Sequence, residues 1–298
     1  MFILHNYIQN YLKPNYNQKL FIRSKVNSII SVMRNNSELS LNEPRKGGSF
    51  EKDTMLRYDL EADVVLIFNK EPKKRKNWEH LMNIVKNNLL DAFPEAEIIE
   101  SSTIRHKILF INNEEEVYID VVPSYYVESL IQIPFHYNSK IYQGITTIWH
   151  LEYFNKFKNL PHFLDIIMLL KDWKNEHNIP LKSFHLEFIT ISAYHYRVTN
   201  TNSIENILKE CFKEIQGMLD GNPIIPVEWD YYTEKDILKN YTIPCLIDSA
   251  NPKDNLLKNI SEKDCKYLKK EVVKAINLLD RVEYRKLFDP NNYTEYFN

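Results

Sequence analysis

The sequence predicts an α+β protein of two lobes, with a mixed sheet and helices in the first half and helices alone in the second. A short β-branched segment at 62–68 reads as a buried strand, and three more strand candidates follow it closely. From residue 147 onward, apolar residues recur every three or four positions, as in amphipathic helices. We therefore predict a mixed α/β lobe at 1–145 and a helical lobe at 146–298, with a cleft between them.

The composition is that of a globular protein. Of 298 residues, 44% are hydrophobic and 13% aromatic, and 38 basic residues against 40 acidic ones leave a net charge of −2. That balance gives no global positive field, so we expect no stable nucleic-acid partner. Cys211, Cys245 and Cys265 lack the spacing of a disulfide framework or a zinc site. We expect a cytoplasmic protein without a membrane partner, because no run of about 18 apolar residues occurs.

The first lobe begins with a long amphipathic helix at 17–35, which we expect to act as a spine, and a polar loop at 35–47 follows it. The basic run Lys73–Lys76, taken as a solvated charge cluster, opens a second helix that continues through Phe93. The remaining strands are predicted at 96–101, 106–111 and 117–122, the last two joined by a hairpin turn at 112–116. The second lobe is predicted to contain helices at 148–157, 160–177, 184–198, 203–218 and 262–283.

Three carboxylates interrupt the predicted strands. Glu61 and Asp63 are two residues apart, so their side chains leave the same face of one strand, and Asp120 lies within another. Such acids are usually surface charges or salt-bridged core groups. Three of them on adjacent strands can instead hold two Mg²⁺ or Mn²⁺ ions, the arrangement used in phosphoryl transfer.

The glycines favour the second interpretation. The chain contains only five, yet Gly47 and Gly48 are adjacent and Ser49 follows them, shortly before the acidic strand. Backbone N–H groups without side chains can approach phosphate oxygens closely, and the serine hydroxyl adds a donor. A plain turn would explain the triplet taken alone.

This order of motifs resembles the nucleotidyltransferases of the oligoadenylate synthetase and cyclic GMP-AMP synthase group. The matching residues are Gly47–Ser49, Thr54, Arg57, the pair Glu61 and Asp63, and the strand around Asp120. Their bacterial relatives, the cyclic-dinucleotide-synthase-like enzymes of antiphage defence, share the pattern. The resemblance implies a bilobed nucleotidyltransferase fold, similar to polymerase β, with Glu61, Asp63 and Asp120 as catalytic metal ligands.

The resemblance continues through the second half. It implies that Gly48, Ser49, Lys171 and Ser183 surround the donor triphosphate and that Phe184 stacks on its base. A late element at 246–255, ending in Asn255, also matches the group. Without the resemblance, Lys171 would be interpreted as a solvated lysine and Ser183 as a helix N-cap. The chain departs from the group at Asp53, where glycine is usual, at Glu61, where aspartate is commoner, and at Phe184, where tyrosine is commoner.

The implied activity is Mg²⁺-dependent joining of nucleoside triphosphates, such as ATP, into a cyclic di- or trinucleotide, with release of pyrophosphate. A downstream effector would sense the product. Nucleotide addition to an RNA end and linear oligoadenylate-type synthesis are alternatives, but the former predicts RNA-binding additions and a basic surface. A catalytically inactive nucleotide-binding module is the non-enzymatic alternative.

Overall fold

The structure is a computed structural model that describes residues 2–69, 75–102, 104–125, 143–199, 203–226, 242–251 and 254–289. The chain divides into two compact units. The sheet unit comprises Pro14–Tyr153, and the helical unit comprises Met1–Lys13 together with Phe154–Asn298. Residues 1–13 therefore belong with the later helices, whereas the sequence placed them with the sheet. Of the predicted basic run, Lys73 and Lys74 lie outside the described residues.

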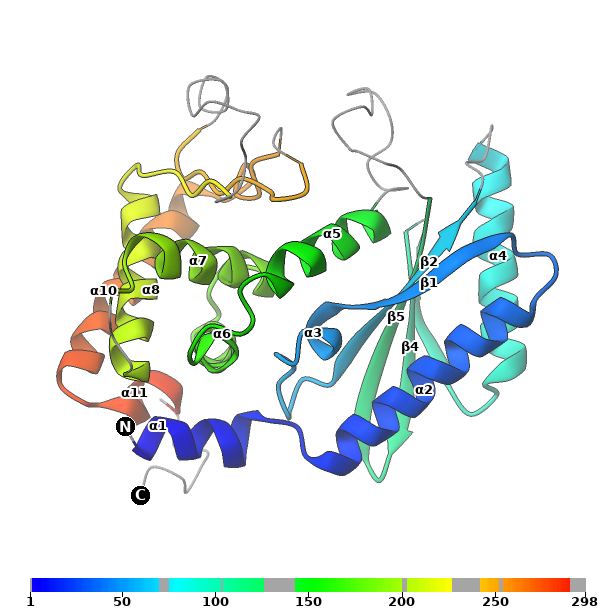
Figure 1. The fold of residues 1–298 in the computed structure, drawn as a ribbon, viewed down its shortest axis with the longest axis horizontal. Coiled ribbons are helices and arrows are strands. Elements are labelled where there is room, and N and C mark those ends of the chain that lie inside the picture. The colour runs from blue at the N-terminus through cyan, green and yellow to red at the C-terminus, as the bar shows by residue number, and fades with distance from the viewer. Residues whose placement is uncertain are drawn as a thin grey trace. The chain divides into compact units, whose positions relative to one another are not determined.

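A five-stranded mixed sheet forms the centre of the sheet unit. The strands lie in the order β1 (Leu41–Gly47), β2 (Glu61–Phe68), β5 (Glu115–Tyr125), β4 (His106–Asn112) and β3 (Glu97–Ser101) (Figure 1). β2 and β5 are parallel, and the other neighbouring pairs are antiparallel. The four predicted strands are confirmed. The predicted hairpin is also confirmed, with positive φ at Asn113 and Glu114.

The edge strand β1 corrects one prediction, because the sequence assigned 35–47 to a polar loop. β1 pairs with β2 from Leu41 opposite Phe68 to Gly47 opposite Asp63. Proline and charged residues give this segment little strand propensity, but an edge strand tolerates both because one side of its backbone has no partner strand. Pairing with β2, rather than local sequence, therefore determines the structure of this segment.

Helices α2 (Tyr16–Asn35) and α4 (Arg75–Ala92) confirm the two helices predicted in the first lobe, and they pack against each other. The His106 ring bonds to the carbonyl of Met82 on α4 at 2.9 Å, so α4 covers the face of β4 that carries His106. Strand register then assigns the apolar residues of β2 to the same face, and all of these are fully buried: Ala62, Val64 and Leu66. Because side chains alternate along a strand, Glu61, Asp63 and Asp120 lie on the opposite face.

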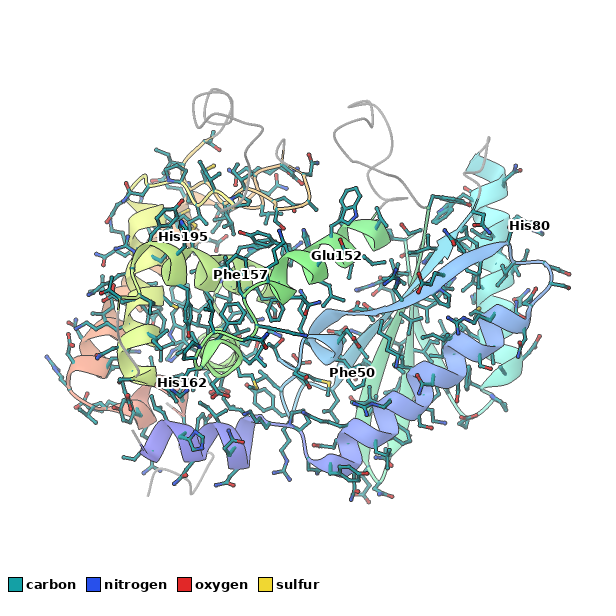
Figure 2. The ribbon with its side chains drawn as sticks, in the orientation of Figure 1. Phe50, His80, Glu152, Phe157, His162 and His195 are labelled. Carbon is teal, nitrogen blue, oxygen red and sulfur yellow. The ribbon has the colours of Figure 1, made fainter. Side chains whose placement is uncertain are left out.

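Two short helices lie near the acidic face of the sheet. α3 (Gly48–Glu51) follows β1, and α5 (Gln143–Asn155) begins against the ends of β2 and β5. A Cβ atom on Gly144 would lie 2.6 Å from the Ser124 Cβ and 2.8 Å from the Val65 Cγ1, so only glycine permits this approach. Figure 2 marks α3 by Phe50 and α4 by His80.

The helical unit contains α6 (Phe163–Glu176), α7 (Ser183–Tyr196), α8 (Ile204–Leu219), α10 (Glu262–Asp280) and α11 (Tyr284–Phe288). Four of these confirm helices predicted in the second lobe, and α11 was not predicted. The remaining predicted helix, at 148–157, is α5, most of which belongs to the sheet unit. The chain start forms α1 (Phe2–Tyr7) and the π-helix η1 (Ile8–Leu12), neither of which the sequence predicted. The buried Tyr7 hydroxyl donates to Asp172 Oδ2 at 2.9 Å and thereby attaches this start to α6. Among the described helices, none is long and apolar enough to cross a lipid bilayer.

Candidate active site

Two of the three predicted acids are brought side by side by the central strand pair. In the parallel register of β2 and β5, Asp63 lies opposite Asp120, and Glu61 lies opposite Tyr118. Neighbouring strands are about 4.8 Å apart, so Asp63 and Asp120 project from adjacent positions on one face. Asp120 is only 3% exposed, whereas Glu61 and Asp63 are partly buried. The prediction that Glu61 and Asp63 share one face of their strand is confirmed, and the register adds Asp120 to that face.

Gly48 packs directly against the Asp63 carboxylate. Its φ is +65°, a left-handed conformation that favours glycine, and an added Cβ would lie 1.6 Å from Asp63 Oδ2. An added Cβ at Gly47 would approach Thr147 Cγ2 of α5 at 2.9 Å. Both positions therefore require glycine, because Gly48 lies against the Asp63 carboxylate and Gly47 lies against α5. A plain turn would not explain these close approaches.

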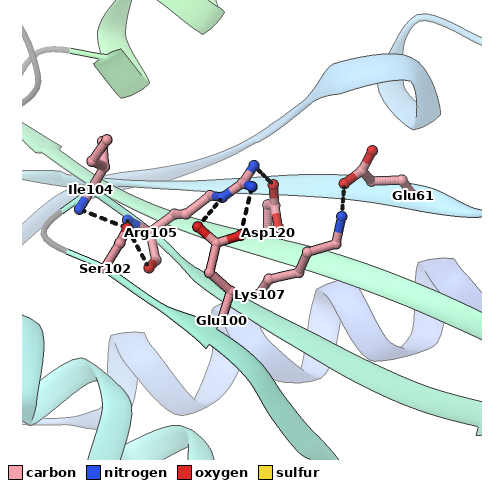
Figure 3. Close-up of polar contacts among 7 residues, drawn as sticks. All are labelled: Glu61, Glu100, Ser102, Ile104, Arg105, Lys107 and Asp120. Atoms are coloured by element: carbon pink, nitrogen blue, oxygen red, sulfur yellow. Dashed lines mark hydrogen bonds and ion pairs between the residues drawn. The ribbon is translucent and has the colours of Figure 1, made fainter.

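Two cations, Lys107 on β4 and Arg105 just before this strand, contact Glu61 and Asp120 (Figure 3). Lys107 lies opposite Asp120 in the antiparallel register, and its Nζ donates to Glu61 Oε1 at 2.5 Å. Arg105 donates through NH1 to Asp120 Oδ2 at 2.6 Å and also contacts Glu100. These ion pairs offset part of the repulsion among the acids.

The acids nevertheless remain poorly solvated and mutually repulsive. Loss of solvation, followed by repulsion from Asp120 and Glu61, raises the pKa of Asp63 to about 7. Burial, followed by repulsion from Glu61, raises the pKa of Asp120 to about 6 even though Arg105 is bonded to it. Raised pKa values of clustered carboxylates are typical of sites that bind cations.

The donor set fits a divalent metal ion in part. Asp120 Oδ1 is buried and accepts no hydrogen bond from the residues that the structure describes, which leaves one carboxylate oxygen available beside Asp63. Carboxylate oxygens are the ligands that Mg²⁺ and Mn²⁺ prefer. In the described parts of the chain, however, no three acidic, histidine or cysteine side chains are arranged to hold one ion. Glu61, the third predicted ligand, is engaged with Lys107.

Ser49, predicted to bind phosphate, lies in α3 and donates its hydroxyl to the backbone carbonyl of Glu61 at 3.2 Å. The hydroxyl would have to turn to donate to a phosphate oxygen, so this role stays a prediction. Asp53, where the group that the motifs resemble usually has glycine, has a φ of +56°. Aspartate is among the few residues that tolerate this left-handed conformation.

The predicted nucleotide-binding residues of the second half belong to the helical unit. Lys171 on α6 is only 4% exposed, so it is not the solvated lysine of the alternative interpretation. Ser183 is the first residue of α7, whereas the N-cap position is occupied by Lys182, which corrects the N-cap interpretation. Phe184 is partly buried, and the Lys182 ammonium lies 5.8 Å from its ring centre. Their approach to the acids of the sheet unit stays a prediction.

The late element predicted at 246–255 is organised by Asn255. Its side-chain oxygen accepts from the backbone N–H groups of Leu246 and Leu257, and its amide donates to the carbonyls of Thr242 and Pro244. Asn255 is 2% exposed, so these four bonds make it a structural residue. Pro252, which the motif also includes, lies outside the described residues.

Arg105 and Lys107 were not identified from the sequence, although a signal was available. The signal is their spacing: Arg105 and Lys107 are two positions apart at the start of the strand beside an acidic one, which indicates paired charges on one sheet face. The predicted turn at 112–116 does not give their register, because pairing Ile111 with Val117 would place Lys107 opposite Val121. The observed turn at Asn113 and Glu114 pairs Asn112 with Glu115 and places Lys107 opposite Asp120.

Comparison with solved structures gives the fold. No protein-family model and no curated protein matches the chain. CdnC of E. coli MS115-1, in its complex with HORMA-deltaN, aligns with a TM-score of 0.69 and 16% identity over 96% of each chain. The chain has a nucleotidyltransferase fold. CdnC with ATP gives the same TM-score at 17% identity over 96% of each chain, and mtPAP in complex with ATPγS gives 0.68 at 11% identity over 93% of this chain and 67% of mtPAP.

The nucleotidyltransferase fold confirms the resemblance found in the motifs at the level of architecture. The mixed sheet with its parallel β2–β5 pair and the helices of the second half are the predicted elements of that fold. Identities of 11–17% are too low to transfer a substrate or a product. Those depend on the side chains described above.

Proposed function

We propose that this protein is a divalent-metal-dependent nucleotidyltransferase that joins nucleoside triphosphates into a cyclic di- or trinucleotide and releases pyrophosphate. The observation that supports it best is the register of Asp63 and Asp120 on parallel strands, with Gly48 against Asp63. The likeness in fold to CdnC with ATP supports a triphosphate as substrate.

Asp63 and Asp120 would hold the metal, with Glu61 joining after it leaves Lys107. The bound ion would supply charge neutralisation for the triphosphate and for the departing pyrophosphate. The left-handed turn at Gly48 holds the backbone against Asp63 and fixes its carboxylate. In the reaction, a ribose hydroxyl oxygen bonds to the α-phosphorus of a second nucleotide, the bond from that phosphorus to pyrophosphate breaks, and the hydroxyl proton is released to solvent. The same step between the two ends of the linear product closes the ring, so one pyrophosphate is released for each bond formed.

Lys171, Ser183 and Phe184 are proposed to bind the donor nucleotide. The positively charged ammonium of Lys171 is suited to contact the negative oxygens of a triphosphate. The partly buried ring of Phe184 offers area for stacking on a base, a contact worth about 1–3 kcal/mol. The near-neutral charge of the chain favours small acceptors over an RNA polyanion, which is why we propose a cyclic product.

The decisive experiment is incubation of the purified protein with Mg²⁺ or Mn²⁺ and four labelled nucleoside triphosphates, followed by phosphatase treatment and separation of products. A phosphatase-resistant species of two or three nucleotides supports the proposal. Phosphatase-sensitive ladders would indicate linear oligonucleotides, and label found only on added RNA would indicate end addition. Absence of any product with either metal would favour the inactive nucleotide-binding module.

Two variants accompany that assay. Asp63→Asn keeps the shape of the side chain and removes a metal-binding oxygen, so product formation should fall to background. Asp91→Asn makes the same chemical change at an exposed position on α4 and should have no effect. Equal activity of the two variants would contradict the assignment of Asp63.

A further inference from the structure

The two oxygens of the Asp120 carboxylate have different surroundings. Oδ2 accepts from Arg105 NH1 at 2.6 Å, whereas Oδ1 is buried and, within the described parts of the chain, accepts no hydrogen bond. A buried carboxylate oxygen without a partner is costly, since it has lost its water and gained nothing in return. An oxygen left in this state, beside a second carboxylate in register, indicates a place for a positively charged ligand.

Arg105 is itself held by contacts that do not involve the three acids (Figure 3). Its Nε and NH2 atoms donate to the two oxygens of Glu100 at 3.3 and 2.8 Å. Its backbone N–H donates to the Ser102 hydroxyl at 3.2 Å, and its carbonyl accepts from the Ser102 N–H at 3.0 Å. Contacts with Ser102 and Glu100 therefore fix both the main chain and the guanidinium of Arg105, independently of its bond to Asp120.

We propose that Arg105 is a positioning residue that binds one oxygen of Asp120 and thereby presents the other to the divalent cation. The inference rests on the proposed function, because it assumes that Asp120 binds a metal. Arg105 touches neither nucleotide nor metal in this role and acts only through Asp120. Glu100 acts one step further away by holding the guanidinium in place.

The role requires arginine rather than any cation. A guanidinium is planar and has five N–H groups in a fixed fork, so it can bind Glu100 and Asp120 at once in a defined geometry. A lysine at this position would keep the charge but could not hold both carboxylates in that way. Arg105→Lys therefore removes the positioning while leaving the electrostatic attraction for a metal nearly unchanged.

The test measures Mn²⁺ affinity of the full chain by the electron paramagnetic resonance signal of free Mn²⁺, without nucleotide. Arg105→Lys and Glu100→Gln should each weaken binding about 10-fold, the low end of the effects seen for residues behind a metal ligand. The double variant should be about as weak as either single one, because both changes disrupt the same connection. Glu95→Gln is the matched control, since it breaks an ion pair of 2.8 Å with Lys25 elsewhere in the sheet unit.

Wild-type affinity in Arg105→Lys, or tighter binding, would overturn the inference. Additive losses in the double variant would also overturn it, because Glu100 would then act independently of Arg105. Asp63→Asn separates this failure from that of the proposed function. If Asp63→Asn binds Mn²⁺ as well as the wild type, the metal site itself is wrong and both proposals fail; if it loses binding while Arg105→Lys does not, only the positioning role fails.

Discussion

Gly48→Ala tests the central geometric feature of the site. In the structure, the added Cβ would lie 1.6 Å from Asp63 Oδ2 and 2.8 Å from Asp63 Cγ. Atoms that are not bonded approach to about 3.5 Å, so the carboxylate or the turn must move by about 2 Å. The backbone cannot simply relax, because Gly48 has a φ of +65° and is preceded by Gly47, which pairs with β2.

The expected effects on activity and stability differ in size. Displacing a catalytic group by about 1 Å costs on the order of 100-fold in rate, so a shift of about 2 Å should reduce turnover by at least that factor. A left-handed alanine costs about 1–2 kcal/mol in the folded state, which lowers the melting temperature by only a few degrees in a chain of this size. Activity should therefore fall far more than stability.

Gly221→Ala provides the matched control. Gly221 also has a positive φ, +113°, but among the described residues its added Cβ would meet only Ile243 Cδ1 at 3.5 Å, an ordinary contact. Both variants are measured for product formation, Mn²⁺ affinity and melting temperature. The control should lose stability and keep Mn²⁺ affinity, whereas Gly48→Ala should lose both Mn²⁺ affinity and turnover. Wild-type turnover in Gly48→Ala would refute the claim that Gly48 positions Asp63.

Three further predictions concern stability. Asp53→Gly removes the backbone strain of a non-glycine residue at a φ of +56° and gives up an exposed ion pair with Lys19, so the melting temperature should rise by a few degrees. An unchanged or lower melting temperature would contradict this. Asn255→Ala leaves four backbone groups without their side-chain partner, so it should lower the free energy of unfolding, measured in urea, by about 3 kcal/mol or more. A loss below about 1 kcal/mol would contradict the structural role of the Asn255 side chain. The pKa of Asp63, about 7 when folded against 3.8 when unfolded, means that the metal-free fold loses stability as pH rises between about 4 and 7. In EDTA, Asp63→Asn should therefore exceed the wild type in melting temperature at pH 8 and by less at pH 5; a constant difference would count against a raised pKa.

The sequence predicted the elements whose hydrophobic pattern is strong. The strand at 62–68 and the long helix at 17–35 follow from apolar runs and spacing, which depend on the residues themselves. β1 and the helices at the chain start were missed for a different reason. β1 forms a strand because its backbone pairs with β2. The first helix is held by the hydrogen bond from Tyr7 to Asp172, 165 residues away. Contacts of that range leave no local pattern.

The same distinction applies to the site. Alternation along β2, which a sequence displays directly, places Glu61 and Asp63 on one face. Asp120 joins them only through the register between β2 and β5, which no local pattern displays. The role of Gly48 could be suspected only because glycine is scarce, since its contact with Asp63 arises from the way β1 returns beside β2. Lys107 could be placed opposite Asp120 only once the turn was known to lie at Asn113 and Glu114, because the longer turn predicted at 112–116 shifts the register by one residue.

The sheet links stability to function through its register. On β2, Ala62 and Val64 are fully buried beneath the helices, while Glu61 and Asp63 bring charge to the other face, where it repels. Side chains alternate with a period of two, so a slip of one residue would place carboxylates in the core and apolar groups in the site. The cost of burying charge makes that slip prohibitive. The apolar residues that contact neither metal nor nucleotide therefore fix where the acids lie, and the stability of the core sets the precision of the site.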